Sequence, residues 1–198
     1  MKKFFSTIAL SALLTTCAMA DDIYLGEPGY GGSGCPSGSA SVTLSPDLKA
    51  LSILFDEFMV EAGGLDGKSL DRKSCNIAIP VHVPSGMSVS VLKVDFRGFL
   101  ALPTGAESRF SSEYFFAGSR GPKLEKTFRG KREDDFTITN EVDLISLVWS
   151  PCGKDVNLRV NTSLLVKTNR FFDEALSTLD SADIKAGLIY HLSFKKCL

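Results

Sequence analysis

The chain has little of what nucleic-acid binding, metal binding or membrane spanning requires. Its 22 basic and 23 acidic residues nearly cancel, so it lacks the positive field that attracts a phosphate backbone, and nucleic acid is not an expected partner. It has two histidines and no C-x-x-C pair, which argues against a zinc site. Beyond the N-terminus no apolar run approaches the roughly 20 residues of a spanning helix, so no transmembrane segment is expected.

The sequence also lacks an assembled catalytic motif. There is no G-x-S-x-G elbow and no H-E-x-x-H. Residues 29–34 match G-x-G-x-x-G, but they neither follow a strand nor open a helix, which predicts a linker and not a phosphate cradle. His82 and His191 fall on the polar faces of expected strands, where histidines are usually solvated. We therefore expect no cofactor and assign no catalytic residue.

The N-terminus has the features of a secretory signal. Lys2 and Lys3 precede an apolar core at 4–14, and Ala18-Met19-Ala20 is a small-x-small cleavage site. Cleavage near Ala20 would leave 20 basic and 23 acidic residues, a net charge of −3, on a secreted or periplasmic protein. A lipid anchor at Cys17 is the alternative, although Thr16 occupies a position where a lipobox has a smaller residue.

After cleavage the cysteine count is even: four remain, at Cys35, Cys75, Cys152 and Cys197. An even count in an exported chain predicts two disulfides, for which three connectivities are possible. We favour Cys35 with Cys75 and Cys152 with Cys197, because each bond then joins segments of one half of the chain. Each would close a loop of about 40 residues, worth about 4 kcal/mol in the chain-entropy account.

Period-two alternation predicts an all-β fold of about ten strands with at most one short helix. The clearest strand covers 156–166, and a second covers 77–83, where Pro80 indicates an edge position. Others are expected at 188–194, 40–44, 108–116, 124–129, 134–139 and 142–149, and a helix at 171–179. This pattern favours an antiparallel β-sandwich, or a distorted barrel with jelly-roll-like connections.

Two phase changes and one glycine-rich segment refine the expected organisation. The apolar face switches near Val91, which predicts a β-bulge. It switches again at Asp56-Glu57, a bend that suits a strand crossing between sheets. Residues 21–34 are rich in Gly and predict a flexible leader, so that 35–198 form a single domain.

Clusters of charged residues supply the candidate sites. Oxygen ligands for Ca²⁺ could converge from two neighbouring loops at Asp134, Asp135, Asn140 and Asp143. Carboxylates at 56, 57 and 61 could pair with that group for glycosidase-like chemistry. An anionic polymer or lipid headgroup could bind a basic run that includes Arg120, Lys123, Lys126 and Arg129. Tyr114 lies in the densest aromatic cluster and is a weaker candidate for binding a sugar. Solvated loop carboxylates and a charged hairpin are the simpler interpretations of the same residues.

Several strings resemble one family when they are taken in order. They include GSGCPSGSASVTLSPDLKALSILFDEFMVEAG, RKSCNIAIPVHVP, LKVDFRGFLALPTGAESRFSSEYFF, WSPCG and LRVNTSLLV. In this order they resemble the secreted family named domain of unknown function 4360, over about residues 33–198. The resemblance implies a small exported protein in which Cys35, Cys75 and Cys152 belong to recurring motifs. It implies no activity, and Cys197 lies outside the strings.

Together these observations favour a non-enzymatic binding module for an envelope component, a glycan or a protein. Two alternatives remain at this stage. One is a secreted hydrolase that uses loop carboxylates, and the other is a membrane-active, toxin-like protein that inserts the Phe-rich hairpin 108–118.

Overall fold

The computed structural model describes residues 22–143, 147–179 and 187–197. The expected signal peptide, its cleavage near Ala20 and the alternative anchor at Cys17 lie outside the described residues. Among the described residues, no helix is both long and apolar enough to cross a membrane.

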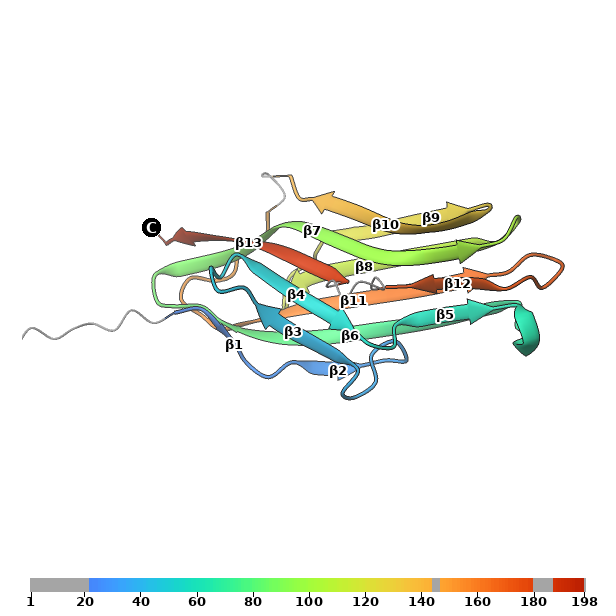
Figure 1. Ribbon diagram of the computed structural model, residues 1–198. Coiled ribbons are helices and arrows are strands. Elements are labelled where there is room, and N and C mark those ends of the chain that lie inside the picture. The colour runs from blue at the N-terminus through green and yellow to red at the C-terminus, as the bar shows by residue number, and fades with distance from the viewer. Residues whose placement is uncertain (1–21, 144–146, 180–186, 198) are drawn as a thin grey trace, which may run out of the picture.

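Thirteen described strands form two antiparallel sheets packed face to face, so the predicted all-β sandwich is confirmed (Figure 1). The six-stranded sheet contains β1 (Tyr24–Leu25), β2 (Gly29–Gly31), β6 (Leu70–His82), β11 (Val156–Lys167), β8 (Glu107–Phe116) and β9 (Lys123–Arg129). The seven-stranded sheet contains β3 (Ala40–Leu44), β4 (Ala50–Phe55), β13 (Leu188–Lys196), β7 (Met87–Leu102), β12 (Ala175–Thr178), β5 (Met59–Ala62) and β10 (Arg132–Glu141).

The core lies between the two sheets, where alternation along each strand places the apolar side chains. In β11, Val160 and Leu164 are fully buried, whereas Arg159 faces solvent, as the sequence predicts. Across the core the rings of Phe96 and Phe110 lie 4.9 Å apart. Such ring pairs join β7 to β8 and thus hold one sheet against the other.

The predicted β-bulge near Val91 is confirmed. Leu192 of β13 lies opposite Val91, but the preceding residue His191 lies opposite Lys93, so β7 contains one extra residue, Leu92. The bend at 56–57 does not carry the chain to the other sheet. It joins β4 to β5 within the seven-stranded sheet, because β4 pairs with β13 while β5 pairs with β12, and both of these pair with β7.

The predicted helix at 171–179 is wrong. Residues 175–178 form β12, which pairs with β5 and with β7, and the only described helical element is the 3₁₀ turn η1 (Gly64–Asp66). Sheet pairing overrides the weak helical spacing of Phe172, Leu176 and Leu179. These residues do not share one buried face, since Phe172 is exposed while Leu179 is fully buried.

The strand expected at 142–149 is also absent from the described residues of that segment, 142–143 and 147–149. Residues 144–146 lie outside the described residues. Val142 donates its backbone N–H to Leu92 O, and Ser150 donates to Val89 O. The described residues on either side of 144–146 therefore reach β7 through isolated hydrogen bonds, and they form no ladder with it.

Part of the leader, expected to be flexible, is paired with the sheet. β1 and β2 both bind β6, and Gly32 approaches Ser74 O so closely that a Cβ would lie 2.2 Å from it. Glycine is therefore used here because it lets two backbone segments lie close together, and not because it makes the leader flexible. β6 has only these two short strands beyond it, and Pro80 lies between them, where the ladder is interrupted.

Both disulfides have the connectivity that the sequence analysis favours. Cys35 bonds to Cys75 with a Cα–Cα distance of 5.3 Å, and both residues are fully buried. Cys152 bonds to Cys197 with a Cα–Cα distance of 6.0 Å, and Cys152 is exposed. The second bond ties the C-terminal strand to the segment before β11.

Candidate functional site

The sandwich has two unlike ends, which we name by their contents. The disulfide end holds the Cys152–Cys197 bond and the β6–β7 turn at 83–86. The loop end holds η1, the β7–β8 loop at 103–106, the β9–β10 turn at 130–131 and the β11–β12 loop at 168–174. Long strands such as β6 and β11 run from one end to the other (Figure 1).

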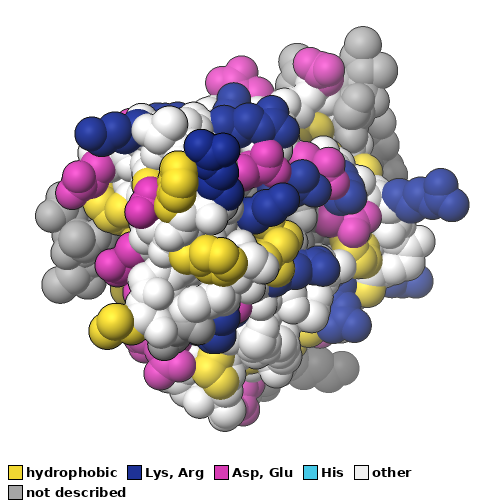
Figure 2. Space-filling model, turned by 90° about the vertical axis from the view of Figure 1, so that its right-hand side faces the viewer, with side chains coloured by type: hydrophobic (Ala, Val, Ile, Leu, Met, Phe, Trp, Pro, Cys, Tyr) yellow, Lys and Arg dark blue, Asp and Glu magenta, His cyan; other side chains and the backbone are white. Residues whose placement is uncertain are grey.

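Exposed hydrophobic side chains gather at the loop end. Six large hydrophobic residues of the described chain are exposed, and four of them belong to this end: Leu65, Leu70, Phe171 and Phe172, which we call the apolar tip. Phe171 is 68% exposed and Phe172 is 46% exposed. Figure 2 shows this end of the molecule, with hydrophobic side chains near the middle and charged ones gathered towards the β9–β10 side. Apolar side chains grouped on loop tips are typical of a contact surface.

Asn169 fixes the loop that carries the two phenylalanines. Its side-chain oxygen accepts hydrogen bonds from the backbone N–H groups of Phe171 and Asp173. Its side-chain nitrogen donates to Asp173 Oδ2 at 2.7 Å and to Thr104 O at 2.9 Å. Thr168 Oγ1 donates to Asp173 O in the same loop. The β11–β12 loop is therefore closed on itself and tied to the β7–β8 loop.

The backbone of Phe172 lies in the left-handed region, with φ at 58°. For a residue with a side chain this conformation costs about 1–2 kcal/mol and is found where surrounding contacts enforce it. Here Gly64 N donates to Phe172 O at 2.9 Å, and a Cβ on Gly63 would lie 2.2 Å from Asp173 O. Glycines in the β5–η1 connection thus let that loop pack against the aromatic loop.

Two shallow hollows adjoin the apolar tip, and Glu174 lines both. The larger, of about 480 Å³, is lined by Ala101, Leu102, Pro103, Lys131, Arg132, Glu133 and Glu174. The smaller, of about 200 Å³, is lined by Glu61, Ala62, Gly63, Gly64, Leu65 and Glu174. The exposed carboxylates of Glu61, Glu133 and Glu174 can accept hydrogen bonds in these hollows, while Lys131 and Arg132 can donate them.

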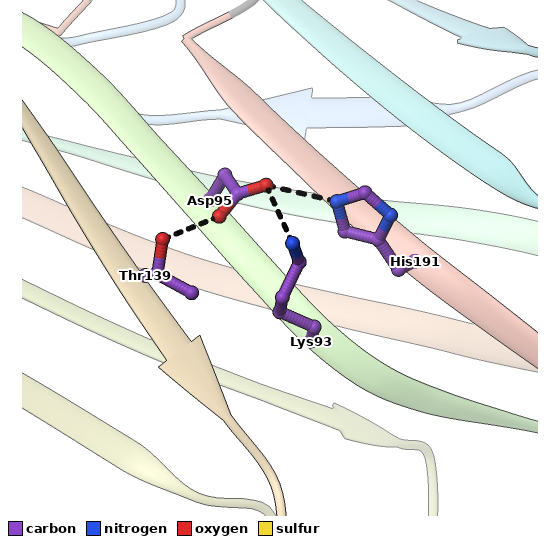
Figure 3. A network of polar contacts seen from close by, with 4 residues as sticks. All are labelled: Lys93, Asp95, Thr139 and His191. Atoms are coloured by element: carbon purple, nitrogen blue, oxygen red, sulfur yellow. Dashed lines mark hydrogen bonds and ion pairs between the residues drawn. The ribbon is translucent and has the colours of Figure 1, made fainter.

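Asp95 is the centre of a second polar group, on the outer face of the seven-stranded sheet (Figure 3). It accepts a hydrogen bond from Thr139 Oγ1 at 2.7 Å, and its other oxygen lies 2.9 Å from His191 Nε2 and 3.5 Å from Lys93 Nζ. Burial acts to raise the pKa of Asp95, but the hydrogen bonds from Thr139 and His191, with Lys93, outweigh it and lower that pKa.

The Asp95 group is structural in character. Its members come from β7, β10 and β13, so the carboxylate connects three neighbouring strands. It is more than a solvated surface ion pair, because Asp95 is only 8% exposed. It lines none of the hollows described above.

The residues proposed for Ca²⁺ do not converge. Asp134, Asp135 and Asn140 all belong to β10, where a rise of about 3.3 Å per residue puts Asp134 and Asn140 about 20 Å apart. Asp134 is bound by Arg132, and Asn140 donates to the Tyr114 hydroxyl. Asp143 follows the strand. Within the described ranges no group of three or more His, Cys, Asp or Glu could hold a metal ion.

The basic candidates are spread along β9 and not gathered in one patch. Arg120 precedes the strand at the disulfide end, and Arg129 ends it at the loop end. Lys123 pairs with Glu125 at 2.7 Å. Arg129 pairs with Glu107 at 2.8 Å and, with help from Arg109, lowers the pKa of that carboxyl. These pairs fit the charged-hairpin interpretation.

The aromatic residues of the 108–118 hairpin are in the wrong place for insertion into a membrane. Phe110, Tyr114 and Phe116 are buried in the core, and Tyr114 is only 2% exposed.

The predicted solvation of the histidines also needs correction. His82 Nδ1 lies 2.7 Å from Asp155 Oδ1, and its ring stacks on Tyr24, while His191 binds Asp95.

Sequence reasoning missed the apolar tip because the residues 171–179 were interpreted as a helix. A usable signal was present in Asn169-Arg170-Phe171-Phe172-Asp173, where Asn and Asp flank two aromatic residues. Asn favours turns that use its side chain as an acceptor, so two phenylalanines inside such a turn cannot both face a core.

The family model described as domain of unknown function DUF4360 matches residues 21–197. The chain belongs to the DUF4360 family. An uncharacterized secreted protein of Arthroderma benhamiae is 30% identical over 179 residues, covering 89% of this chain and 73% of that protein. The DUF4360 chain, with its two disulfides and this secreted relative, is an exported protein of oxidising surroundings.

One solved structure also resembles the DUF4360 chain in outline. It is TmCBM61 in complex with β-1,4-galactotriose, at 8% sequence identity and a TM-score of 0.33, over 85% of this chain and 88% of that one.

Proposed function

We propose that this DUF4360 protein is an exported, non-catalytic binding module that holds a neutral glycan chain at its loop end. The observation that carries the proposal is the exposed pair Phe171 and Phe172, fixed by Asn169 and Gly63 beside two hollows that share Glu174. Sugars present flat C–H faces and edges of hydroxyl groups. Aromatic rings and ionised side chains recognise these two features respectively.

The charges near the tip favour a hydroxyl-rich ligand over a lipid surface. Glu61, Glu133 and Glu174 line the two hollows at the loop end, and inserting this end into a bilayer would remove carboxylates from water at high cost. A sugar hydroxyl, in contrast, can donate to a carboxylate and accept from Arg132 or Lys131. Mixed charge in the larger hollow also favours a neutral ligand over a polyanion.

The fixed loop favours a ligand that meets a preformed surface. Arg170 places its guanidinium 4.6 Å from the centre of the Phe171 ring, and that ring is still 68% exposed to a ligand. Because the loop is already closed by Asn169, little conformational entropy is lost on binding.

The proposal is tested by depletion from solution onto insoluble polysaccharides, including chitin, β-1,3-glucan, cellulose and peptidoglycan, followed by calorimetry with soluble oligosaccharides. We expect Phe171→Ala/Phe172→Ala to weaken binding at least about tenfold, since the stacking of a sugar on one ring is worth on the order of 1 kcal/mol and the variant removes two rings. Tyr24→Ala is the matched control, because Tyr24 is 56% exposed but lies at the other end of β6.

Three results would overturn the proposal. Binding that is unchanged in the double phenylalanine variant would move the site elsewhere. Release of reducing sugars from any of the polysaccharides would identify a hydrolase. Retention on phosphatidylcholine vesicles, with none on polysaccharide, would assign the apolar tip to a membrane.

A further inference from the structure

The two sheets end side by side along one flank of the molecule. β9 is the last strand of the six-stranded sheet and pairs with β8, while β10 pairs with β7 in the other sheet (Figure 1). The rings of Phe128 and Phe136 lie 4.9 Å apart and close the gap between the two strands. No further strand pairs with either of them among the described residues, so each presents a free backbone edge.

The two free edges carry opposite charge. β9 contains Lys123, Lys126 and Arg129 against Glu125, a net charge of +2, and β10 contains four acids against Arg132, a net charge of −3. Some of these charges are paired within the chain, as in Lys123–Glu125 and Arg132–Asp134. Within the described part of the chain, Lys126 on β9 and three acids on β10 form no ion pair: Glu133, Asp135 and Glu141.

Charged edge strands usually prevent aggregation, and that is their simplest role here. The protection is selective, however, because the edges differ in sign. A contact that brings β9 against a second β9, or β10 against a second β10, is repulsive. A contact between β9 of one copy and β10 of another is attractive.

We propose that this flank is the interface of a twofold symmetric dimer, in which β9 of each copy pairs with β10 of the other. Rotation about an axis parallel to the strands exchanges the two sheets and brings these edges together twice. β9 runs towards the loop end and β10 runs away from it, so the two strands meet antiparallel, as a ladder requires. Their lengths, seven and ten residues, allow all of β9 to be paired.

The symmetry has a consequence for binding, which rests on the proposed function. An axis parallel to the strands leaves both loop ends facing the same direction, so the two apolar tips could meet one polysaccharide surface together. Two linked sites bind such a surface more tightly than one by an effective-concentration effect. The dimer itself does not depend on the identity of the ligand.

Sedimentation velocity of the mature chain over a range of protein and salt concentrations tests the dimer. We expect a dimer at low salt that dissociates as salt rises. Lys123→Glu/Lys126→Glu changes the β9 charge from +2 to −2, and Glu133→Lys/Asp135→Lys changes the β10 charge from −3 to +1. Either pair alone should weaken the dimer at least about tenfold, since like charges then meet.

The variant with all four substitutions restores opposite signs and should dimerise again. Lys49→Glu/Lys154→Glu is the control, because it makes the same charge change as the β9 pair at exposed positions of the disulfide end. A monomer at all concentrations in low salt would refute the dimer. A dimer that persists in each two-residue variant, with only one edge reversed at a time, would place the interface elsewhere. Loss of polysaccharide binding with the dimer intact would count only against the proposed function.

Discussion

The two ends of the sandwich are both closed, but by different means. At the disulfide end the Cys152–Cys197 bond is reinforced by Cys197 N donating to Gly86 O and Gly153 N donating to Met87 O. At the loop end no disulfide is present among the described residues, and Asn169 with Gly63 provides the closure. Both ends therefore have ordered connections.

The two ends differ in how far their aromatic side chains are exposed. Near the disulfide end, the single tryptophan, Trp149, has Lys195 Nζ 4.2 Å from its ring centre and is half-buried. At the loop end, Phe171 and Phe172 are exposed on a loop that the side chain of Asn169 holds through several hydrogen bonds. Exposure at the loop end is therefore not a by-product of a loose chain, since the loop that exposes these rings is fixed.

Removing the covalent closures should have the largest effect. Cys152→Ala/Cys197→Ala opens a loop with a sequence separation of 45 and should lower the free energy of unfolding by about 4 kcal/mol. Cys35→Ala/Cys75→Ala has a similar separation, 40, but both residues are fully buried, so the loss should be larger. Urea titrations of both variants check this order. Equal losses would mean that burial of the first bond contributes nothing.

Adding one methyl group at Gly63 should disrupt the packing of the loop end. Gly63→Ala places a Cβ against the backbone oxygens of Phe172 and Asp173 at a residue with φ of +84°, and should cost about 3 kcal/mol. Gly86→Ala, at the disulfide end, has φ of +78° and open space around the Cβ, so it should cost only about 1 kcal/mol.

Thermal melts and polysaccharide depletion distinguish the two glycine variants. Gly63→Ala should reduce both stability and ligand binding, because it displaces the aromatic loop. If Gly86→Ala proved as damaging as Gly63→Ala, positive φ alone and not the close packing of the loops would explain the effect.

A smaller effect than that of the cysteine pairs or of Gly63 should come from Asp95, which lies on the sheet face between the two ends. Its folded-state pKa is lowered, so the folded protein binds fewer protons than the unfolded chain in acid. The resulting stability is present above about pH 4, the ordinary pKa of Asp, and is lost as the pH falls through the folded-state pKa.

Asp95→Asn should therefore cost about 2 kcal/mol at neutral pH and flatten the acid limb of a stability profile. Denaturant titrations from neutral pH into that acid range check it. Thr43→Ala, on the outer face of β3, is a neutral control. A variant whose acid limb keeps the wild-type slope would show that other carboxylates carry the dependence.

Much of the fold could be predicted from local patterns. The strand at 156–166 was found because a half-buried strand must alternate, and the bulge at Leu92 was found because an extra residue reverses that alternation. The segment 171–179 was misinterpreted because its apolar spacing is short and ambiguous, and only pairing with β5 and β7 decides that 175–178 is a strand. The candidate site depends on this same segment and was missed with it.

Composition and order alone determined an exported β protein with two disulfides, since these follow from residue type, spacing and alternation along one strand at a time. Only the tertiary structure decided that the Ca²⁺ candidates lie along one strand, that Asp95 is buried between three strands, and that Phe171 and Phe172 face solvent. The reason is that each of these properties depends on which distant segment packs against the residue. Alternation along a strand shows which of its faces is buried, but it does not identify the distant segment that covers that face.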